Sequence, residues 1–274
     1  MSGQSITETG RGVAIATEHG RLPRRRVVLL LQLGVFVLVV GTWQVLAATE
    51  LIDPFFYSRP SAIAAKIWEW LSSGYIWPHL AVTLIEALLA FVIGSALGIA
   101  AGLALARIEL LAAIFDPYIR ILNALPRVIL APIFILWFGL DIASKVALGV
   151  TLVFFVVFFN TFQGIREVDP VVRDNARMLQ ATDRQMLRHV YLPSAMAWIF
   201  SSLHTSIGFA LVGAVVGEYI GASRGIGYVV AQAQGVFDTT GVFAGLILTS
   251  AVVLCIDLAI NRLERYLLRW RPGG

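Results

Sequence analysis

The chain alternates between long, predominantly apolar stretches and shorter polar connections. A helix needs about 20 such residues to cross roughly 30 Å of hydrocarbon. Six stretches meet this length, which predicts six membrane spans at approximately 27–48, 80–106, 113–140, 146–162, 198–220 and 242–261. The expected fold class is an all-α membrane protein.

Proline and tryptophan modify this pattern at two places. Pro126 and Pro132 fall inside the third predicted span, where each removes a backbone hydrogen bond and kinks the helix. Between the first two spans, residues 61–71 predict a short helix lying at the membrane surface, with Ser61 as its N-cap. Trp68 and Trp70 suit such an interfacial position.

The first 26 residues are polar and end in three consecutive arginines, as at the front of a signal sequence. The apolar stretch that follows is longer than the 7–15 residues of a signal-peptide core. It therefore predicts an uncleaved span preceded by a disordered cytoplasmic tail. The expected division is a tail over 1–26 and one membrane domain over 27–274.

Composition supports the membrane assignment. The chain is 58% hydrophobic and 14% charged, and its mean hydropathy is +0.80. Little sequence remains for a soluble catalytic domain. The net charge of +4 comes from basic residues beside the apolar stretches, which favours an inner-leaflet edge over nucleic-acid binding. Cys255 stands alone, so the chain has no intramolecular disulfide.

The positions of the basic residues predict the orientation. With the N-terminus inside, the outer loops hold four basic residues: Arg59, Lys66, Lys145 and Arg224. The cytoplasmic segments hold fourteen, namely Arg21, Arg24, Arg25, Arg26, Arg107, Arg166, Arg173, Arg177, Arg184, Arg188, Arg262, Arg265, Arg269 and Arg271. Both termini are therefore expected in the cytoplasm.

Two spans carry glycine at every fourth position, which makes one face of each helix nearly flat. Such a face serves either ordinary packing within the chain or a subunit interface or pathway lining. The glycines are Gly94, Gly98 and Gly102 in the second span and Gly213, Gly217 and Gly221 in the fifth.

The longest polar stretch inside the hydrophobic body is 164–193. Asp169 before Pro170 predicts one helix start, and Thr182 with Gln185 forms a capping box that predicts another. Two short helices joined by a turn near Gln180 would lie on the cytoplasmic face. Their interleaved apolar and arginine residues suit docking on a partner protein or contact with lipid headgroups.

This stretch resembles the EAA loop of binding-protein-dependent ABC importer permeases. In that loop, E-A-A and a glycine precede I-x-L-P at fixed spacing. Here Asp174, Asn175 and Ala176 stand at E-A-A, Gln180 stands at the glycine, and the segment ending in Pro193 matches I-x-L-P. The spacing is kept, while Asp replaces Glu, Asn replaces Ala and Gln replaces Gly.

Three further segments resemble the sulfonate, taurine and nitrate subfamily of these permeases: 125–140, 218–228 and 261–265 with Trp270. The likeness implies the type I importer fold and a prokaryotic inner-membrane location. It also implies a second permease copy, ABC ATPase subunits and an extracytoplasmic binding protein as partners, besides membrane lipid. The residues that it assigns to ATPase coupling are Arg173, Asp174, Asn175, Ala176, Arg177, Gln180, Ala181, Leu192 and Pro193.

On this interpretation the chain is not an enzyme and holds no cofactor or metal, and ATP binds to a partner subunit. No G-x-x-x-x-G-K-[ST] phosphate-binding motif occurs in the sequence, which agrees with a separate ATPase. The alternative is an ion-coupled secondary transporter, for which Glu86, Glu218 and Asp257 are the candidate relay residues. A membrane enzyme would need paired carboxylates, a nucleophile motif or a metal cluster, and none was recognised.

Two residues are candidates for the translocation pathway, Arg127 and Glu218. Counted from Ala113, Arg127 lies roughly 20 Å into the third predicted span. A charge there must face protein or water, so Arg127 either helps an anionic solute to pass or bonds carbonyls freed by the prolines. A homodimer is expected, and a heterodimer of two similar permeases remains open.

Overall fold

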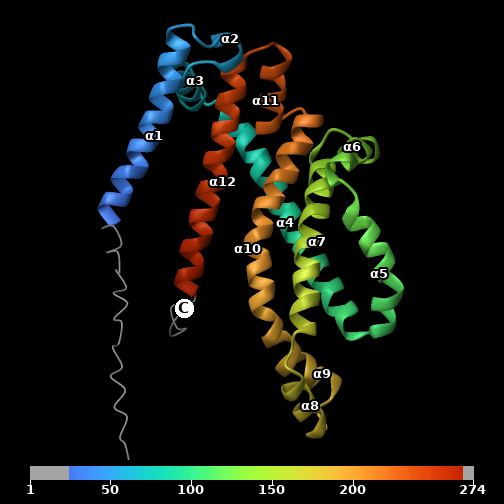
Figure 1. The fold of residues 1–274 in the computed structure, drawn as a ribbon. Helices are drawn as coiled ribbons and strands as arrows, with labels where there is room; N and C mark the ends of the chain where they lie inside the picture. Colours follow the sequence, from blue (N-terminus) through green and yellow to red (C-terminus); the bar gives the residue numbers. More distant parts are fainter. Residues whose placement is uncertain (1–24, 268–274) are drawn as a thin grey trace, which may run out of the picture.

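The computed structural model describes residues 25–267, and within this range the chain is helical with no strand (Figure 1). The helices are α1 (Arg25–Ala48), α2 (Pro54–Tyr57), α3 (Pro60–Ser72), α4 (Ile76–Arg107), α5 (Glu109–Ala124), η1 (Arg127–Leu130), α6 (Ala131–Phe138), α7 (Ile142–Arg166), α8 (Pro170–Met178), α9 (Asp183–Met186), η2 (Leu187–Tyr191), α10 (Leu192–Ile220), α11 (Ile226–Gly235) and α12 (Thr239–Leu267). Residues 1–24 of the tail predicted over 1–26 lie outside the described residues, as do the C-terminal Arg269, Trp270 and Arg271, while Arg25 and Arg26 begin α1.

Five of the described helices are long and apolar enough to cross a membrane: α1, α4, α7, α12 and the continuous α9–α10 segment. The third predicted span is a bent pair, α5 with η1 and α6, whose two parts meet at 88°. A kink was expected, and a break is found. Leu125 is extended because Pro126 follows it, whereas Pro132 sits in the first turn of α6, where proline is tolerated.

The core of the molecule is the contact of α4 and α10 with α7. The glycine faces are what allow these helices to approach. A Cβ on Gly98 would lie 2.8 Å from the backbone oxygen of Phe154, and one on Gly213 would lie 2.5 Å from the Cα of Gly149. The glycines therefore serve packing within the chain, and the alternative of a subunit interface is wrong for these contacts.

One end of this bundle is covered by α11, and α2 and α3 lie beside it against α1 and α12 (Figure 1). The predicted surface helix is present as α3, but its N-cap is Arg59, because Pro60 takes the first helical position. Ser61 lies inside that first turn, and its backbone N–H donates to the side chain of Gln44 at 3.0 Å. The helices α2 and α11 were not predicted.

The other end carries α8 and α9, which extend beyond α7 and α10 (Figure 1). Both predicted helix starts are confirmed: Asp169 accepts from the N–H of Val171 at 2.8 Å, and Thr182 with Gln185 forms the capping box. Between them Gln180 has φ +57°, the left-handed turn expected of a glycine at this position.

Candidate functional site

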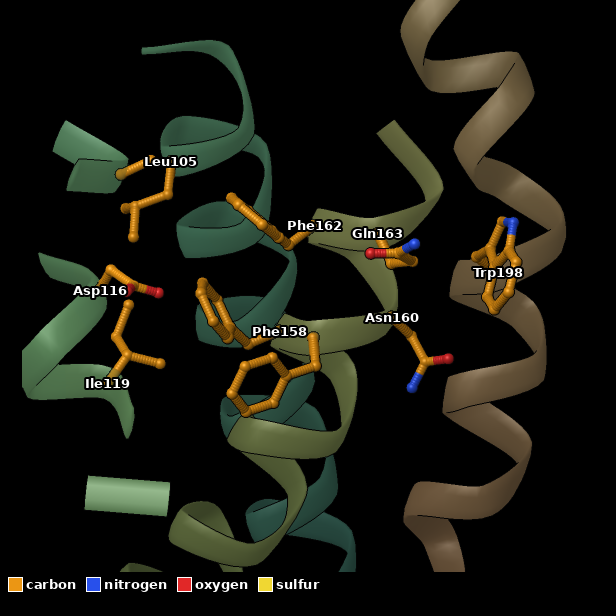
Figure 2. A pocket seen from close by; sticks show the side chains of 10 residues that line it. Leu105, Asp116, Ile119, Phe158, Asn160, Phe162, Gln163 and Trp198 are labelled. Atoms are coloured by element: carbon orange, nitrogen blue, oxygen red, sulfur yellow. The ribbon is translucent and has the colours of Figure 1, made fainter. Parts of the chain in front are cut away.

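A cavity of about 400 Å³ opens among α4, α5, α7 and α10, in the half of the bundle nearer α8 and α9. Its walls differ in chemistry. Figure 2 shows Phe158 and Phe162 on one side and the side-chain amides of Asn160 and Gln163, beside Trp198, on another. The lining residues are Leu105, Ala112, Asp116, Ile119, Phe158, Phe159, Asn160, Phe162, Gln163 and Trp198.

Polar side chains form a stripe on α5 beside this cavity. Asp116, Arg120 and Asn123 are spaced by four and three residues, so they share one helix face. Asp116 lines the cavity and accepts a hydrogen bond from Arg120 Nε at 2.8 Å. Both side chains are largely exposed within this chain. Charged groups are costly against lipid, so this face of α5 meets water or another protein.

Arg127 lies at the break between α5 and α6. Its guanidinium carbon is 4.5 Å from the ring centroid of Phe155 on α7, and its terminal nitrogen donates to the side chain of Asn123. The Nε atom is buried and has no hydrogen-bond partner. Among the described residues, Arg127 therefore contacts an aromatic face and a side-chain amide, not the backbone carbonyls that its alternative role required.

The ring of Phe155 connects Arg127 with the cavity. It stacks on Phe159 with centroids 6.2 Å apart, and Phe159 is part of the cavity wall. Phe158 and Phe162 continue the aromatic face along α7, with centroids 5.9 Å apart. A cation and a row of aromatic rings thus lead into the cavity, a lining suited to a solute with both a charged and an apolar part.

At the opposite end of the bundle, three charged side chains from three helices meet in the interior. Glu86 of α4 and Glu218 of α10 are 2% and 1% exposed and lie within hydrogen-bonding reach of each other. Lys145 of α7, 1% exposed, donates to the backbone oxygens of Leu140 and Asp141, the latter at 3.2 Å. Lys145 is thus buried inside α7, and its assignment to an outer loop was wrong.

Glu218 also holds the beginning of α11. Its two carboxylate oxygens accept from the Thr83 hydroxyl at 2.6 Å and from the N–H of Gly227 at 2.7 Å. Thr83 in turn accepts from the N–H of Ile226 at 2.9 Å. Gly225, at φ +114°, leaves room for the carboxyl group, which a Cβ there would approach to 2.1 Å. In this conformation Glu218 is enclosed and does not line the cavity described above.

The predicted coupling residues lie in three places on and beside α8 and α9, and Arg173 of α8 is half-buried. Asp174, Asn175, Arg177 and Gln180 are exposed. Ala176 and Ala181 instead pack on a small core of Val168, Met186 and Val190, while Leu192 and Pro193 begin α10. Ala176 and Ala181 therefore stabilise the helical pair from inside.

The exposed side of this pair mixes charge with apolar surface. Arg173 donates to Asp174 at 3.1 Å, and this hydrogen bond raises the pKa of the arginine. Met178 and Leu179, which were not among the predicted coupling residues, are 82% and 83% exposed. We call Arg173, Asp174, Asn175, Arg177, Met178, Leu179 and Gln180 the α8–α9 surface.

Sequence reasoning also missed most of the cavity. Asp116 and Asn160 lie in predicted spans and Gln163 directly follows one, and their polarity in or beside apolar stretches was the available signal. The four-residue spacing of Asp116 and Arg120 would have placed both on one face of a helix.

A family of known proteins matches most of this chain. The family described as "Binding-protein-dependent transport system inner membrane component" matches residues 94–269, which include α4–α10 from Gly94 onward, α11 and α12. The chain belongs to this family. It is an inner-membrane ABC transporter permease and not an enzyme, so the carrier alternative is set aside.

Individual relatives cover nearly the whole permease. It is 34% identical to the putative aliphatic sulfonates transport permease protein SsuC of Bacillus subtilis, over 85% of this chain and 84% of that one. It is 32% identical to the riboflavin transport system permease protein RibX of Chloroflexus aurantiacus, over 86% and 88%. It is 28% identical to the taurine permease TauC of Escherichia coli, over 91% and 92%.

Solved structures show the same fold as this permease. A chain of an amino acid ABC transporter superimposes with a TM-score of 0.58 at 21% identity, covering 73% of this permease and 97% of that chain. An inward-facing MetNI methionine transporter gives 0.56 at 21%, covering 72% and 96%. The type I importer fold expected from the sequence is thereby confirmed.

Proposed function

We propose that this permease forms the translocation path for a small anionic or polar organic solute, delivered by an extracytoplasmic binding protein, and that the α8–α9 surface couples it to a separate ATPase. Both termini and the α8–α9 surface then face the cytoplasm. The basic residues near the span ends support this orientation.

The observation that carries the coupling proposal is the exposure of Met178 and Leu179. They lie at the C-terminal end of α8. This helix belongs to a capped helical pair that extends beyond the spans (Figure 1). Large apolar side chains this exposed, next to Arg173 and Arg177, suit an interface with an apolar centre and a charged rim. Gln180 keeps the turn that presents them.

The test is association with the ATPase. The permease is co-expressed with its cognate ABC ATPase and purified through a tag on the permease. Leu179→Asp places a charge at the centre of the proposed interface and is expected to reduce the co-purified ATPase at least tenfold. The matched control is Val236→Asp at the opposite end, where Val236 is 74% exposed. If the Leu179→Asp permease co-purifies with the same amount of ATPase per permease as the unmodified protein, this surface does not couple the two.

We also propose that the permease works as a homodimer whose second copy faces the polar stripe of α5. The glycine faces, on which a dimer was first expected, are already filled by α7. The polar stripe of α5 is the reason for placing the second copy there, because Asp116 and Arg120 are exposed on a helix that forms part of a predicted span. The space between two such stripes would extend the cavity into a path.

Cysteine cross-linking tests this arrangement in the assembled importer. Ala113 lies on the same face as Asp116, and Leu38 lies on the exposed α1. In a Cys255→Ala background, Ala113→Cys is expected to cross-link two permease copies, and Leu38→Cys is the control that does not. Only monomers within an active complex would contradict the dimer, and a link to a different permease would show a heterodimer.

The solute class rests on Arg127 and the aromatic face of α7. A guanidinium above Phe155 can attract an anion, while Phe158 and Phe159 accept an apolar part. The relatives carry names of sulfonate, taurine and riboflavin permeases. Thermal-shift screening of the cognate binding protein against anionic, neutral and cationic solutes tests the class. Stabilisation by cationic solutes alone would contradict it.

A further inference from the structure

Polar groups are buried at the α11 end of the bundle, next to the apolar side chains of Ile226 and Val229. Glu86, Lys145 and Glu218 are almost completely buried there, as is Thr83. These four side chains belong to α4, α7 and α10, the helices that form the core. A permanent contact between helices is usually stabilised at lower cost by apolar side chains, because buried charges lose their hydration.

The hydrogen bonds of this cluster also fix a fourth helix. The backbone N–H groups of Gly225, Ile226 and Gly227 at the start of α11 donate to His79 at 3.1 Å, to Thr83 and to Glu218. The first N–H groups of a helix have no partner within the helix. Side chains of α4 and α10 therefore accept from three N–H groups at the start of α11.

One polar atom of the cluster stays without a partner. The Oε2 atom of Glu86 is buried and accepts no hydrogen bond, although Glu86 lies within reach of Glu218. Such a group costs free energy in the closed arrangement and regains its hydration when water enters. The closed arrangement thus holds α11 in place and at the same time carries a penalty that opening removes.

We propose that Thr83, Glu86, Lys145 and Glu218 form a latch that keeps α11 closed over the outer ends of α4, α7 and α10, and that this latch opens in each transport cycle. The inference rests on the proposed function, since it needs a partner ATPase to drive the opening. These residues are positioning residues for translocation. When the latch opens, water reaches Thr83 and Glu218, and the end of the path opposite the cavity becomes accessible.

A thiol placed in the latch reports its opening without knowledge of the solute. In a Cys255→Ala background, Thr83→Cys is purified with the ATPase in nanodiscs and treated with a negatively charged maleimide. Labelling is compared without nucleotide and after trapping with ATP and vanadate. We expect an increase of at least tenfold on trapping. The control is Thr161→Cys, equally buried but packed against Gly102 in the other half, which stays unlabelled in both states.

A cross-link distinguishes a latch that moves from a contact that is only structural. The backbone nitrogen of Ile226 lies 2.9 Å from the Thr83 hydroxyl, so Thr83→Cys with Ile226→Cys is the pair chosen to tie α4 to α11, and formation of the disulfide is checked first by mass spectrometry. Oxidation is expected to abolish the ATP hydrolysis stimulated by the binding protein, and reduction to restore it. The control pair is Ser58→Cys with Thr240→Cys, whose hydroxyls are 2.8 Å apart at the same end, and its oxidation leaves hydrolysis unchanged.

The possible outcomes distinguish a failure of the latch from a failure of the proposed function as an ATPase-coupled permease. If the ATPase neither co-purifies nor hydrolyses ATP with the unmodified permease, the proposed function fails. If hydrolysis is normal but Thr83→Cys stays unlabelled after trapping, or the oxidised Thr83–Ile226 pair retains full stimulated activity, the latch is overturned and the proposed function stands. Should Thr83→Cys not assemble, Ser144→Cys, buried beside Lys145, serves as the labelling probe.

Discussion

The two ends of the α4–α7–α10 bundle use polar side chains in opposite ways. At the α11 end, Glu218 and Lys145 are buried; Glu218 is bonded to α4 and α11, and Lys145 to the backbone just before α7. At the α8–α9 end, arginines and amides are exposed, and a cavity reaches up between the helices. The same helices are thus closed at one end and open at the other.

This difference shows that one chain can use one end of its helix bundle to fix the arrangement of the helices and the other end to bind a solute or a partner. Buried polar groups demand partners, and they therefore fix the arrangement of α4, α10 and α11 at one end. Exposed polar groups at the other end remain available to a solute or a partner protein. Mutations at the closed end are expected to act mainly on stability, and mutations at the open end mainly on activity.

The largest effect is expected for Glu218→Leu at the closed end. It leaves the Thr83 hydroxyl and the N–H of Gly227 without their acceptor and removes a carboxyl group near Lys145. Losing one member of a buried charged network costs about 3–5 kcal/mol, equivalent to roughly 10 °C in the midpoint of thermal unfolding. The measurement is thermal unfolding in detergent. Glu218→Gln keeps an acceptor and should lose much less; equal losses would show that charge, not hydrogen bonding, matters.

The next largest effect concerns Gly98, where α4 packs against α7 between the two ends of the bundle. Gly98→Ala would push a methyl group to within 2.8 Å of the Phe154 backbone oxygen. Overpacking of this kind costs about 1–3 kcal/mol, so the unfolding midpoint should fall by several degrees. Gly34→Ala in α1, where nothing lies within 4 Å, is the control. A stable Gly98→Ala protein would show that α4 and α7 can separate freely.

Near the middle of α7, where Arg127 lies over Phe155, Arg127→Gln tests activity. Removing the guanidinium takes away a charge-assisted contact with an anion, worth about 1.5–3 kcal/mol. Transport of an anionic solute into proteoliposomes should fall by about tenfold or more, with little change in the unfolding midpoint. Arg127→Lys should keep part of the rate. Wild-type transport by Arg127→Gln would remove Arg127 from the path.

The smallest effect is expected at the turn between α8 and α9. Gln180 has φ +57°, a conformation that costs a non-glycine residue about 1 kcal/mol. Gln180→Gly should therefore retain the ATPase and stabilise the pair slightly. Gln180→Val, with a β-branched side chain in the same turn, should weaken ATPase co-purification. Equal binding by both variants would mean that the turn geometry does not matter for coupling.

Local rules predicted the parts of this fold that depend on neighbouring residues. Asp169 and Thr182 cap their helices because capping involves only the next three residues. The prediction of Ser61 as an N-cap was wrong because Pro60 takes the first helical position and makes Arg59 the N-cap. The site of the break at Pro126 was visible, but its angle of 88° was not, since proline marks where a helix ends and not where the chain goes next.

The site depended on contacts that no local rule describes. Glu86 and Glu218 were each noted as costly charges in spans, yet their meeting arises from the packing of α4 against α10. The helix α11 was missed because it is short and follows a glycine-rich connection. The cavity residues were missed because residue spacing shows only which side chains share a helix face. Which helix or cavity that face contacts depends on the packing of the whole chain.

The central position of α7 has a consequence for biogenesis. During synthesis α4 emerges well before α7, so its glycine face first meets lipid or the insertion machinery. The face gains its proper neighbour only after α5 and α6 have been made, and α10 joins later still. The start of α11 then receives its side-chain partners from helices already in the membrane. Assembly therefore ends at the α11 end, and a ribosome that stalls before Gly227 leaves an unfinished bundle for quality control to recognise.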